Sequence, residues 1–132
     1  MEQGKPVILC VDDEENSLFL RKLVLQKSGY EVITARSGRE ALEILESRSF
    51  DLMLSDLLMP EMSGAELTRH VKDRHPRLPV ILISGVNEFP PEAQCADLLM
   101  NKVEGPAKLC ENIAAVLKRL GLPRETSEHG WV

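Results

Sequence analysis

Acidic, hydroxyl and amine side chains directly follow four short apolar runs in this sequence of 132 residues. The pair Asp12 and Asp13 follows the first run, Asp56 and Lys102 follow two later runs, and Ser84 ends another. If these runs are parallel strands of one sheet, their carboxyl ends meet at one edge, where open α/β sheets bind their ligands. We therefore expect the five side chains to converge at that edge.

Three carboxylates at one edge would repel one another, by about 4 kcal/mol for two like charges about 4 Å apart at an effective dielectric constant near 20. Lys102 supplies one compensating charge, and Mg²⁺ or Mn²⁺ fits the rest, because a hard divalent ion prefers carboxylates, waters and a substrate phosphate. A carboxylate, a metal ion, a lysine and a hydroxyl are the groups that phosphoryl transfer requires. The carboxylate attacks, while the metal and the lysine neutralise charge on the transferred oxygens.

Each of these residues also has an ordinary structural interpretation. An acid pair after a strand is most often a helix cap with first-turn acids, and a single Asp or a Ser-Gly pair usually belongs to a turn. A lone lysine is usually a solvated surface residue. The functional interpretation is favoured because four separate strand ends agree.

The segments around these residues alternate between two patterns. Apolar runs predict strands over residues 6–11, 31–35, 52–54, 79–84 and 98–100. Helical spacing, capping boxes and prolines predict helices over residues 14–28, from Ser37 onward, 63–75, 90–96 (short) and 106–120. Strands that alternate with helices predict crossover connections, and almost wholly apolar strands predict a parallel sheet covered on both faces. The fold class is therefore a doubly wound α/β domain.

Composition narrows the classes of protein further. The net charge of −5 argues against direct nucleic-acid binding, which requires a basic face. No apolar run is long enough for a signal peptide or a membrane span, and three dispersed cysteines indicate reduced thiols, so we expect a cytoplasmic location. We expect one domain over residues 1–120, a flexible tail over residues 121–132, and a monomer or weak dimer.

Four segments resemble the CheY-like receiver domain of two-component response regulators. They are residues 11–15, 55–64, 83–85 and 101–102, and the resemblance extends over about residues 5–120. It implies a five-stranded sheet in the flavodoxin-like order 2-1-3-4-5. It also implies that Asp56 accepts a phosphoryl group from a sensor histidine kinase or a phosphotransfer protein.

The resemblance further assigns roles to the neighbouring residues. Asp12, Asp13, Asp56 and the backbone carbonyl of Leu58 would hold Mg²⁺, while Ser84 and Lys102 would bind the phosphoryl group. Such a domain catalyses only its own phosphorylation and dephosphorylation and is not an enzyme with turnover on a metabolite. The output would be a shift of the face built from the helix before the last strand, the last strand and the last helix, read by a downstream protein or output domain.

The sequence departs from the family pattern on this output face. Val103 stands where the family has a proline joined by a cis peptide bond, and a trans bond is expected here. Leu99 occupies the position of the switch aromatic, and the segment from residue 84 to 102 is about one helical turn shorter than usual. We therefore expect the fourth helix to be short, displaced or partly unwound. Leu58 and Val86 flank the path of the hydrolytic water, and both are apolar, so loss of the phosphoryl group should be slow to moderate.

Three alternatives remain. A degenerate receiver could serve as a phosphorylation-independent scaffold that binds proteins. A phosphotransferase or phosphatase with an aspartyl-phosphate intermediate normally has a second Asp two residues after the nucleophile, where this chain has Leu58. A flavodoxin-like nucleotide binder would need a Gly-rich phosphate loop after the first strand, which is absent from the sequence.

Overall fold

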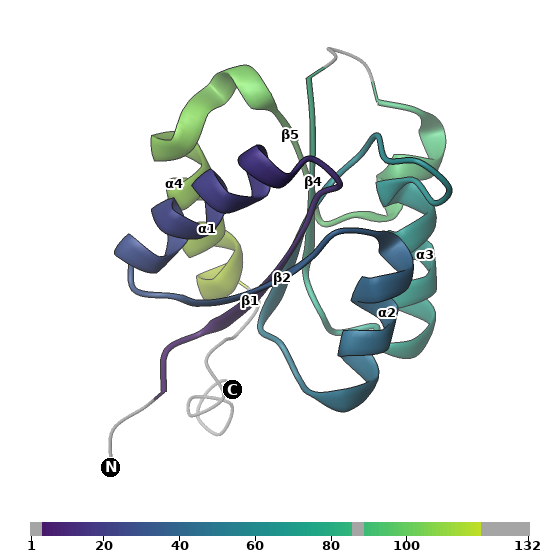
Figure 1. The fold of residues 1–132 in the computed structure, drawn as a ribbon, viewed down its shortest axis with the longest axis horizontal. Helices are drawn as coiled ribbons and strands as arrows, with labels where there is room; N and C mark the ends of the chain where they lie inside the picture. The colour runs from purple at the N-terminus through teal and green to yellow at the C-terminus, as the bar shows by residue number, and fades with distance from the viewer. Residues whose placement is uncertain (1–3, 86–88, 120–132) are drawn as a thin grey trace.

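A parallel sheet of five strands forms the centre of the molecule, with helices on both sides (Figure 1). The computed structural model describes residues 4–85 and 89–119. The strands are β1 (Val7–Val11), β2 (Glu31–Ala35), β3 (Leu52–Asp56), β4 (Val80–Ser84) and β5 (Leu98–Asn101). They lie in the order β2-β1-β3-β4-β5, and every neighbouring pair is parallel. The predicted fold class and strand order are confirmed.

The inner strands are buried on both faces, as their apolar sequences predict. Every residue of β3 and β4 is buried, whereas β2 and β5 at the edges of the sheet are partly exposed. The prediction that the third strand stops before Ser55 was wrong by two residues. Asp56 still pairs with Ile83 in the ladder, and the Leu57 amide donates to the Ile83 carbonyl at 2.8 Å. The polar residues Ser55 and Asp56 are thus part of the strand.

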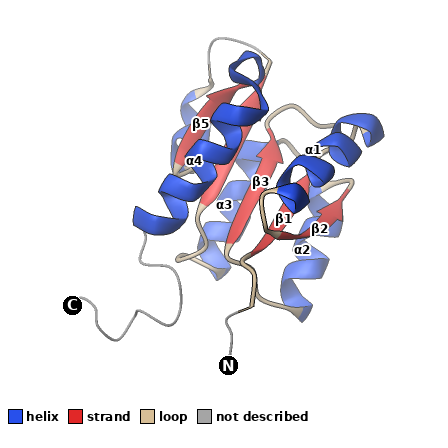
Figure 2. Cartoon of the chain, turned by 90° about the vertical axis from the view of Figure 1, so that its left-hand side faces the viewer, coloured by secondary structure: helices blue, strands red, loops and turns tan. Residues whose placement is uncertain are grey.

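Two pairs of α-helices cover the two faces of the sheet (Figures 1 and 2). One pair is α1 (Glu15–Lys27) and α4 (Gly105–Arg119), and the other is α2 (Gly38–Ser47) and α3 (Gly64–Arg74). Hydrogen bonds between side chain and backbone fix the N-termini of α2 and α3. Ser37 accepts from the Glu40 amide at 3.0 Å, and Ser63 and Glu66 form the reciprocal pair of a capping box.

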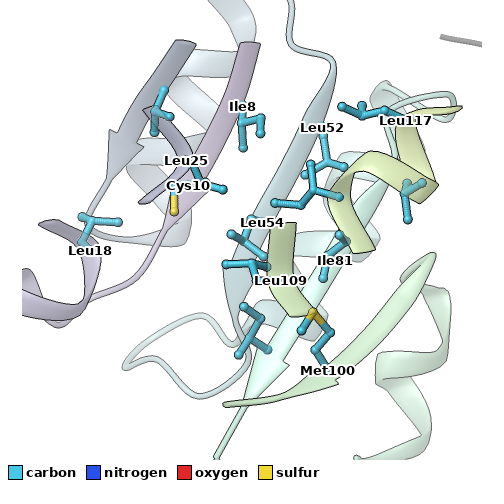
Figure 3. Close-up of a cluster of buried hydrophobic side chains, with 14 residues drawn as sticks. Ile8, Cys10, Leu18, Leu25, Leu52, Leu54, Ile81, Met100, Leu109 and Leu117 are labelled. Atoms are coloured by element: carbon cyan, nitrogen blue, oxygen red, sulfur yellow. The ribbon is translucent and has the colours of Figure 1, made fainter. Parts of the chain in front are cut away.

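Alternate side chains of each inner strand enter different cores. Ile8 and Cys10 of β1 pack with α1 and α4 in the cluster drawn in Figure 3, which includes Leu18, Leu25 and Leu109. The side chains between them in the sequence point to the opposite cluster, where the sheet packs with α2 and α3. The side chains of β3 and β4 alternate in the same way, so each inner strand contributes to both cores.

The connection from β4 to β5 contains a short 3₁₀ helix, η1 (Pro91–Cys95), among its described residues. It packs against α3 and buries Ala93 completely. This agrees with the expectation that the helix between the fourth and fifth strands is short or partly unwound. Asp97, just after η1, accepts hydrogen bonds from the Val80 amide and from Lys72 Nζ, both at 2.8 Å. These bonds tie the end of the connection to β4 and α3.

Two further expectations concern the C-terminal tail and membrane-spanning segments. The predicted tail over residues 121–132 lies outside the described residues, and the last helix is described as far as Arg119. Across residues 4–85 and 89–119, no helix combines the length and apolar character needed to cross a membrane.

Candidate functional site

Three carboxylates meet at the carboxyl ends of the neighbouring strands β1 and β3. Asp12 follows β1, Asp56 ends β3, and one oxygen atom from each of Asp12, Asp13 and Asp56 lies within 4.8 Å of the other two. The Asp12 amide donates to the Ala35 carbonyl at 3.1 Å, which continues the ladder past the end of β1. Asp12 and Asp56 are only 1% and 5% exposed. The pairing of β1 with β3 is what brings these distant parts of the sequence together.

Lys102 reaches this cluster from the end of β5. Its Nζ atom lies 3.0 Å from Asp56 Oδ1, close enough for an ion pair. A 3₁₀ helix that the sequence did not predict, η2 (Lys102–Glu104), holds the backbone there. Asn101 caps this helix. Its Oδ1 atom accepts a hydrogen bond from the backbone amide of Val103, and its backbone amide donates to Glu104 Oε2, both at 2.9 Å. This capping box fixes the position of the Lys102 backbone, from which the side chain extends toward Asp56.

Ser84 closes β4 directly opposite Asn101 of β5 and is 1% exposed. It therefore lies at the same edge of the sheet as Asp56, which pairs one step earlier with Ile83. All five residues proposed from the strand ends occur at this edge.

The charge of Asp56 is subject to opposing effects. Burial raises the pKa of the Asp56 carboxyl above its ordinary value. The ammonium group of Lys102 lowers this pKa, the Asp12 carboxylate raises it, and Arg21 lowers it, but burial is the largest effect. The buried Oδ1 atom accepts no hydrogen bond of good geometry from the described residues, although Lys102 lies beside it. Asp56 thus retains capacity to bind a further cation.

The site also fits a hard divalent cation by its donor set. Every candidate ligand side chain in the cluster is a carboxylate, which suits Mg²⁺ or Mn²⁺ rather than a metal that prefers nitrogen or sulfur.

Arg21 is a site residue that the sequence reasoning missed. It projects from α1, and its Nη1 atom lies 3.1 Å from Asp12 Oδ2. Its side chain is only 11% exposed. A signal was present in the sequence, because Arg21 lies three residues after Leu18 and four before Leu25, both buried on the inner face of α1. Helical spacing therefore places this arginine on the face toward the sheet.

The loop after β3 returns tightly to begin α3. The Gly64 amide donates to the Leu57 carbonyl at 2.7 Å. A Cβ atom at position 64 would collide with the backbone oxygen of Asp56 and with the Leu82 side chain. A glycine is therefore needed for α3 to start this close to the acceptor residue.

The remaining predicted positions are Leu58, Val86, Leu99 and Val103. The Leu58 side chain is 60% exposed in the loop after β3, and Val103 in η2 is 85% exposed. Leu99 of β5 is partly buried and packs against the core on the side of α2 and α3. Val86 lies outside the described residues.

With this geometry established, comparison with known proteins identifies the family. Residues 8–113 match the family described as the response regulator receiver domain. The chain belongs to this family. Receiver domains of two-component systems are not enzymes in the ordinary sense of turnover on a separate substrate.

Solved structures share the receiver fold. TrrA from Thermotoga maritima, determined in complex with Mg²⁺-BeF, has a TM-score of 0.81 and 32% identity, covering 85% of this chain and 99% of that one. A CheY-like receiver domain protein from Methanospirillum hungatei has a TM-score of 0.82 and 30% identity, covering 89% and 97%.

Curated relatives include both transcriptional regulators and a sensor kinase. The regulator PhoP of Bacillus subtilis is 31% identical over 125 residues, which cover 92% of this receiver and 52% of PhoP. The sensor kinase/phosphatase CqsS of Vibrio cholerae is 34% identical over 113 residues, covering 73% of this receiver and 16% of CqsS. This receiver therefore spans about half of the length of PhoP and a smaller part of CqsS.

Proposed function

We propose that this receiver is a signalling switch that accepts a phosphoryl group on Asp56 in a Mg²⁺-dependent reaction. The observation that carries the proposal is the placement of Lys102 Nζ 3.0 Å from Asp56 Oδ1, in a cluster where the oxygens of three carboxylates lie within 4.8 Å. The donor would be a phosphohistidine on a sensor histidine kinase or a phosphotransfer protein. Relatives that are regulators and kinases of two-component systems support this class of donor.

The metal ion would be held by Asp12, Asp13 and Asp56, with the backbone carbonyl of Leu58 as a further ligand. The buried Asp56 Oδ1, which lacks a hydrogen bond of good geometry within the described residues, supports this assignment. When bound, the ion supplies positive charge that neutralises the transferred phosphoryl oxygens. Mn²⁺ has the same ligand preference and would substitute for Mg²⁺.

In the transfer step, an oxygen of Asp56 attacks the phosphorus atom of the phosphohistidine. The new O–P bond forms as the P–N bond breaks, and the bonding electrons leave with the imidazole nitrogen. Lys102 pairs with a phosphoryl oxygen, and the Ser84 hydroxyl donates a hydrogen bond to another. Later attack by water on the acyl phosphate returns the Asp56 carboxylate and releases inorganic phosphate.

Contacts to the phosphoryl group would favour one of two conformations and so pass the signal to a protein partner. Ser84 and Asn101 face each other at the ends of β4 and β5, and Lys102 follows Asn101 into η2 and α4. New contacts at Ser84 and Lys102 would therefore act on β5, η2 and the start of α4. Gating by an aromatic rotamer is not part of this proposal, because Leu99 occupies the switch position.

We also place this receiver in the cytoplasm, as a monomer or weak dimer without direct contact to nucleic acid or membrane. The cysteines Cys10, Cys95 and Cys110 are all free thiols, which supports a reducing compartment. The net charge of −5 supports a protein partner rather than nucleic acid.

Phosphorylation can be tested directly with acetyl phosphate as the small donor. In the presence of Mg²⁺, the intact protein should gain the mass of one phosphoryl group. EDTA or the substitution Asp56→Ala should abolish the gain, whereas Asp73→Ala, which removes an exposed carboxylate of α3, should leave it unchanged. If the wild type gains no mass, or if the gain persists in Asp56→Ala, the proposal is wrong.

A further inference from the structure

Arg21 is placed unusually for a charged residue, between α1 and the acidic cluster. Its guanidinium contacts Asp12 Oδ2 at 3.1 Å, and the two side chains are 11% and 1% exposed. Asp12 Oδ1 accepts a second hydrogen bond from the Glu14 amide at 3.0 Å. Both oxygens of this proposed metal ligand are therefore already engaged within the protein.

A buried ion pair of this kind has a strong effect on its neighbours. Because both partners are withdrawn from water, their charges are weakly screened, and an unpaired Asp12 would be strongly destabilising. The field of Arg21 also extends across the site, since it contributes to lowering the pKa of Asp56. Arg21 is thus coupled to two of the three carboxylates.

The cations and carboxylates of the site nearly balance before any metal binds. Arg21 pairs with Asp12, and Lys102 pairs with Asp56, so the three carboxylates retain a single net negative charge. A divalent ion would change this to a single net positive charge if Arg21 and Lys102 both keep their positions beside the carboxylates. The arginine should therefore oppose metal binding, although it stabilises the metal-free protein.

Space beside Arg21 is available on one side of the site. A cavity of about 250 Å³ between α1 and α4 is lined by Arg21 together with Leu20, Met100, Asn101 and Lys102. The arginine therefore lies at a solvent-connected boundary of the site, where a substitution of similar length can be accommodated without repacking the core.

We propose that Arg21 is a built-in counter-cation for Asp12, which replaces part of the metal's charge when no metal is bound and lowers the affinity of the cluster for Mg²⁺. This inference rests on the metal site of the proposed function. Arg21 is a positioning residue in this scheme, because it acts on the phosphoryl-transfer groups through Asp12.

The test compares the wild type with Arg21→Met, which keeps much of the length of the side chain and removes its charge. Mg²⁺ affinity is measured by calorimetric titration and, with Mn²⁺ as a second probe, from the electron paramagnetic resonance signal of the free ion. Arg21→Met should bind Mg²⁺ about tenfold more tightly, equivalent to about 1.4 kcal/mol. Its thermal midpoint in EDTA should fall below that of the wild type, and saturating Mg²⁺ should raise the midpoint more than it does in the wild type.

Two further variants separate charge from shape. Arg21→Lys keeps the positive charge and should restore an affinity within about threefold of the wild type. Arg36→Met removes a positive charge from an exposed pair with Glu15 at 4.0 Å, and it should change the affinity by less than about twofold, because that pair is screened by solvent. If Arg21→Met does not fold in EDTA, Arg21→Gln provides the same uncharged comparison with a hydrogen-bond donor retained.

The possible failures are distinguishable. If neither the wild type nor the variants bind Mg²⁺ or Mn²⁺, the proposed metal site is wrong, and this inference is wrong with it. If the wild type binds but Arg21→Met and Arg21→Gln bind equally well or more weakly, the metal site stands and the role of Arg21 is overturned. A merely structural role would predict weaker binding in the uncharged variants, opposite to the increase expected here.

Discussion

Asp56 lies in surroundings that disfavour its charged form, although the proposed chemistry requires a carboxylate. Burial is the largest effect and raises its pKa, while Lys102 and Arg21 only partly offset that effect. A bound divalent cation would favour the charged form further. Added positive charge would therefore act in the same direction as Lys102 and Arg21 and lower the pKa of Asp56.

This pKa shift predicts a pH-dependent effect of Asp56→Asn on stability. The pKa of Asp56 is higher in the folded than in the unfolded protein, so the unfolded chain loses this proton first as pH rises. Asp56 therefore reduces the free energy of unfolding once the pH exceeds the ordinary carboxyl pKa of about 4. In EDTA, the Asn variant should be more stable than the wild type at neutral pH, and its advantage should shrink toward about pH 3.

Urea unfolding at several pH values measures this difference. Saturating Mg²⁺ provides the control, because it should stabilise the wild type more than the variant. An advantage of the Asn variant that stays constant from acid to neutral pH would contradict the prediction.

The side chain of Leu58 leads to a prediction for the lifetime of the phosphorylated state. Its exposed, apolar side chain follows the acceptor by two residues and cannot orient a water molecule for hydrolysis. We predict slow to moderate decay, and acceleration by about tenfold in Leu58→Asn, whose amide can hydrogen-bond water. Intact mass followed over time after removal of acetyl phosphate gives both rates. Leu23→Asn, which changes an exposed leucine of α1, is the control. A wild-type half-life of seconds would contradict this expectation.

At the scale of elements, the start of α3 depends on close approach to β3. In Gly64→Ala, the new methyl group would contact the Asp56 carbonyl and the Leu82 side chain, so α3 must shift. We expect a loss of about 2–3 kcal/mol in the free energy of unfolding. Gly85→Ala is the matched control, since its Cβ would meet only Lys102 Cδ at 3.9 Å. Equal losses in the two variants, measured by urea unfolding, would argue against a special packing constraint at Gly64.

Asp97 fixes the end of the connection between β4 and β5. Its carboxylate accepts from the Val80 amide and Lys72 Nζ, and its own amide donates to the Val80 carbonyl at 2.8 Å. Asp97→Ala should therefore reduce the free energy of unfolding by about 2 kcal/mol, since it leaves a backbone donor without its partner. Asp73→Ala, on the exposed side of α3, should change it by less than about 0.5 kcal/mol. Chemical denaturation of both variants measures these losses, and equal losses would contradict the role given to Asp97.

At the scale of the whole molecule, metal binding and folding should be linked. Asp12, Asp13 and Asp56 lie together only in the folded chain, so Mg²⁺ should bind the native state in preference to the unfolded one. The free energy of unfolding should rise by about 2.7 kcal/mol at a Mg²⁺ concentration about 100 times the dissociation constant. Thermal unfolding over a Mg²⁺ titration measures it, and Asp13→Asn should reduce the gain. A midpoint that is independent of Mg²⁺ would contradict the proposed site.

The sequence predicted the fold well because the signals are local. Apolar runs marked the strands, and Ser63 with Glu66 marked the start of α3. The polar strand ends also predicted which residues meet at the site, since parallel strands end at the same edge. The ion pair of Arg21 with Asp12 was missed, because it depends on how α1 lies against the sheet. The η2 turn was missed because it rests on hydrogen bonds of Asn101 and Glu104 that have no apolar pattern.

The position of β1 in the sheet, between β2 and β3, has a consequence for the newly made chain. Asp12 and Asp13 leave the ribosome well before Asp56, and the intervening β2 can pair with β1 while β3 is still absent. Mutual repulsion among all three carboxylates then arises only when β3 joins β1, because Asp56 is the last residue of β3. Repulsion among the three carboxylates therefore acts once β3 has joined the sheet and is absent from the earlier stages of folding.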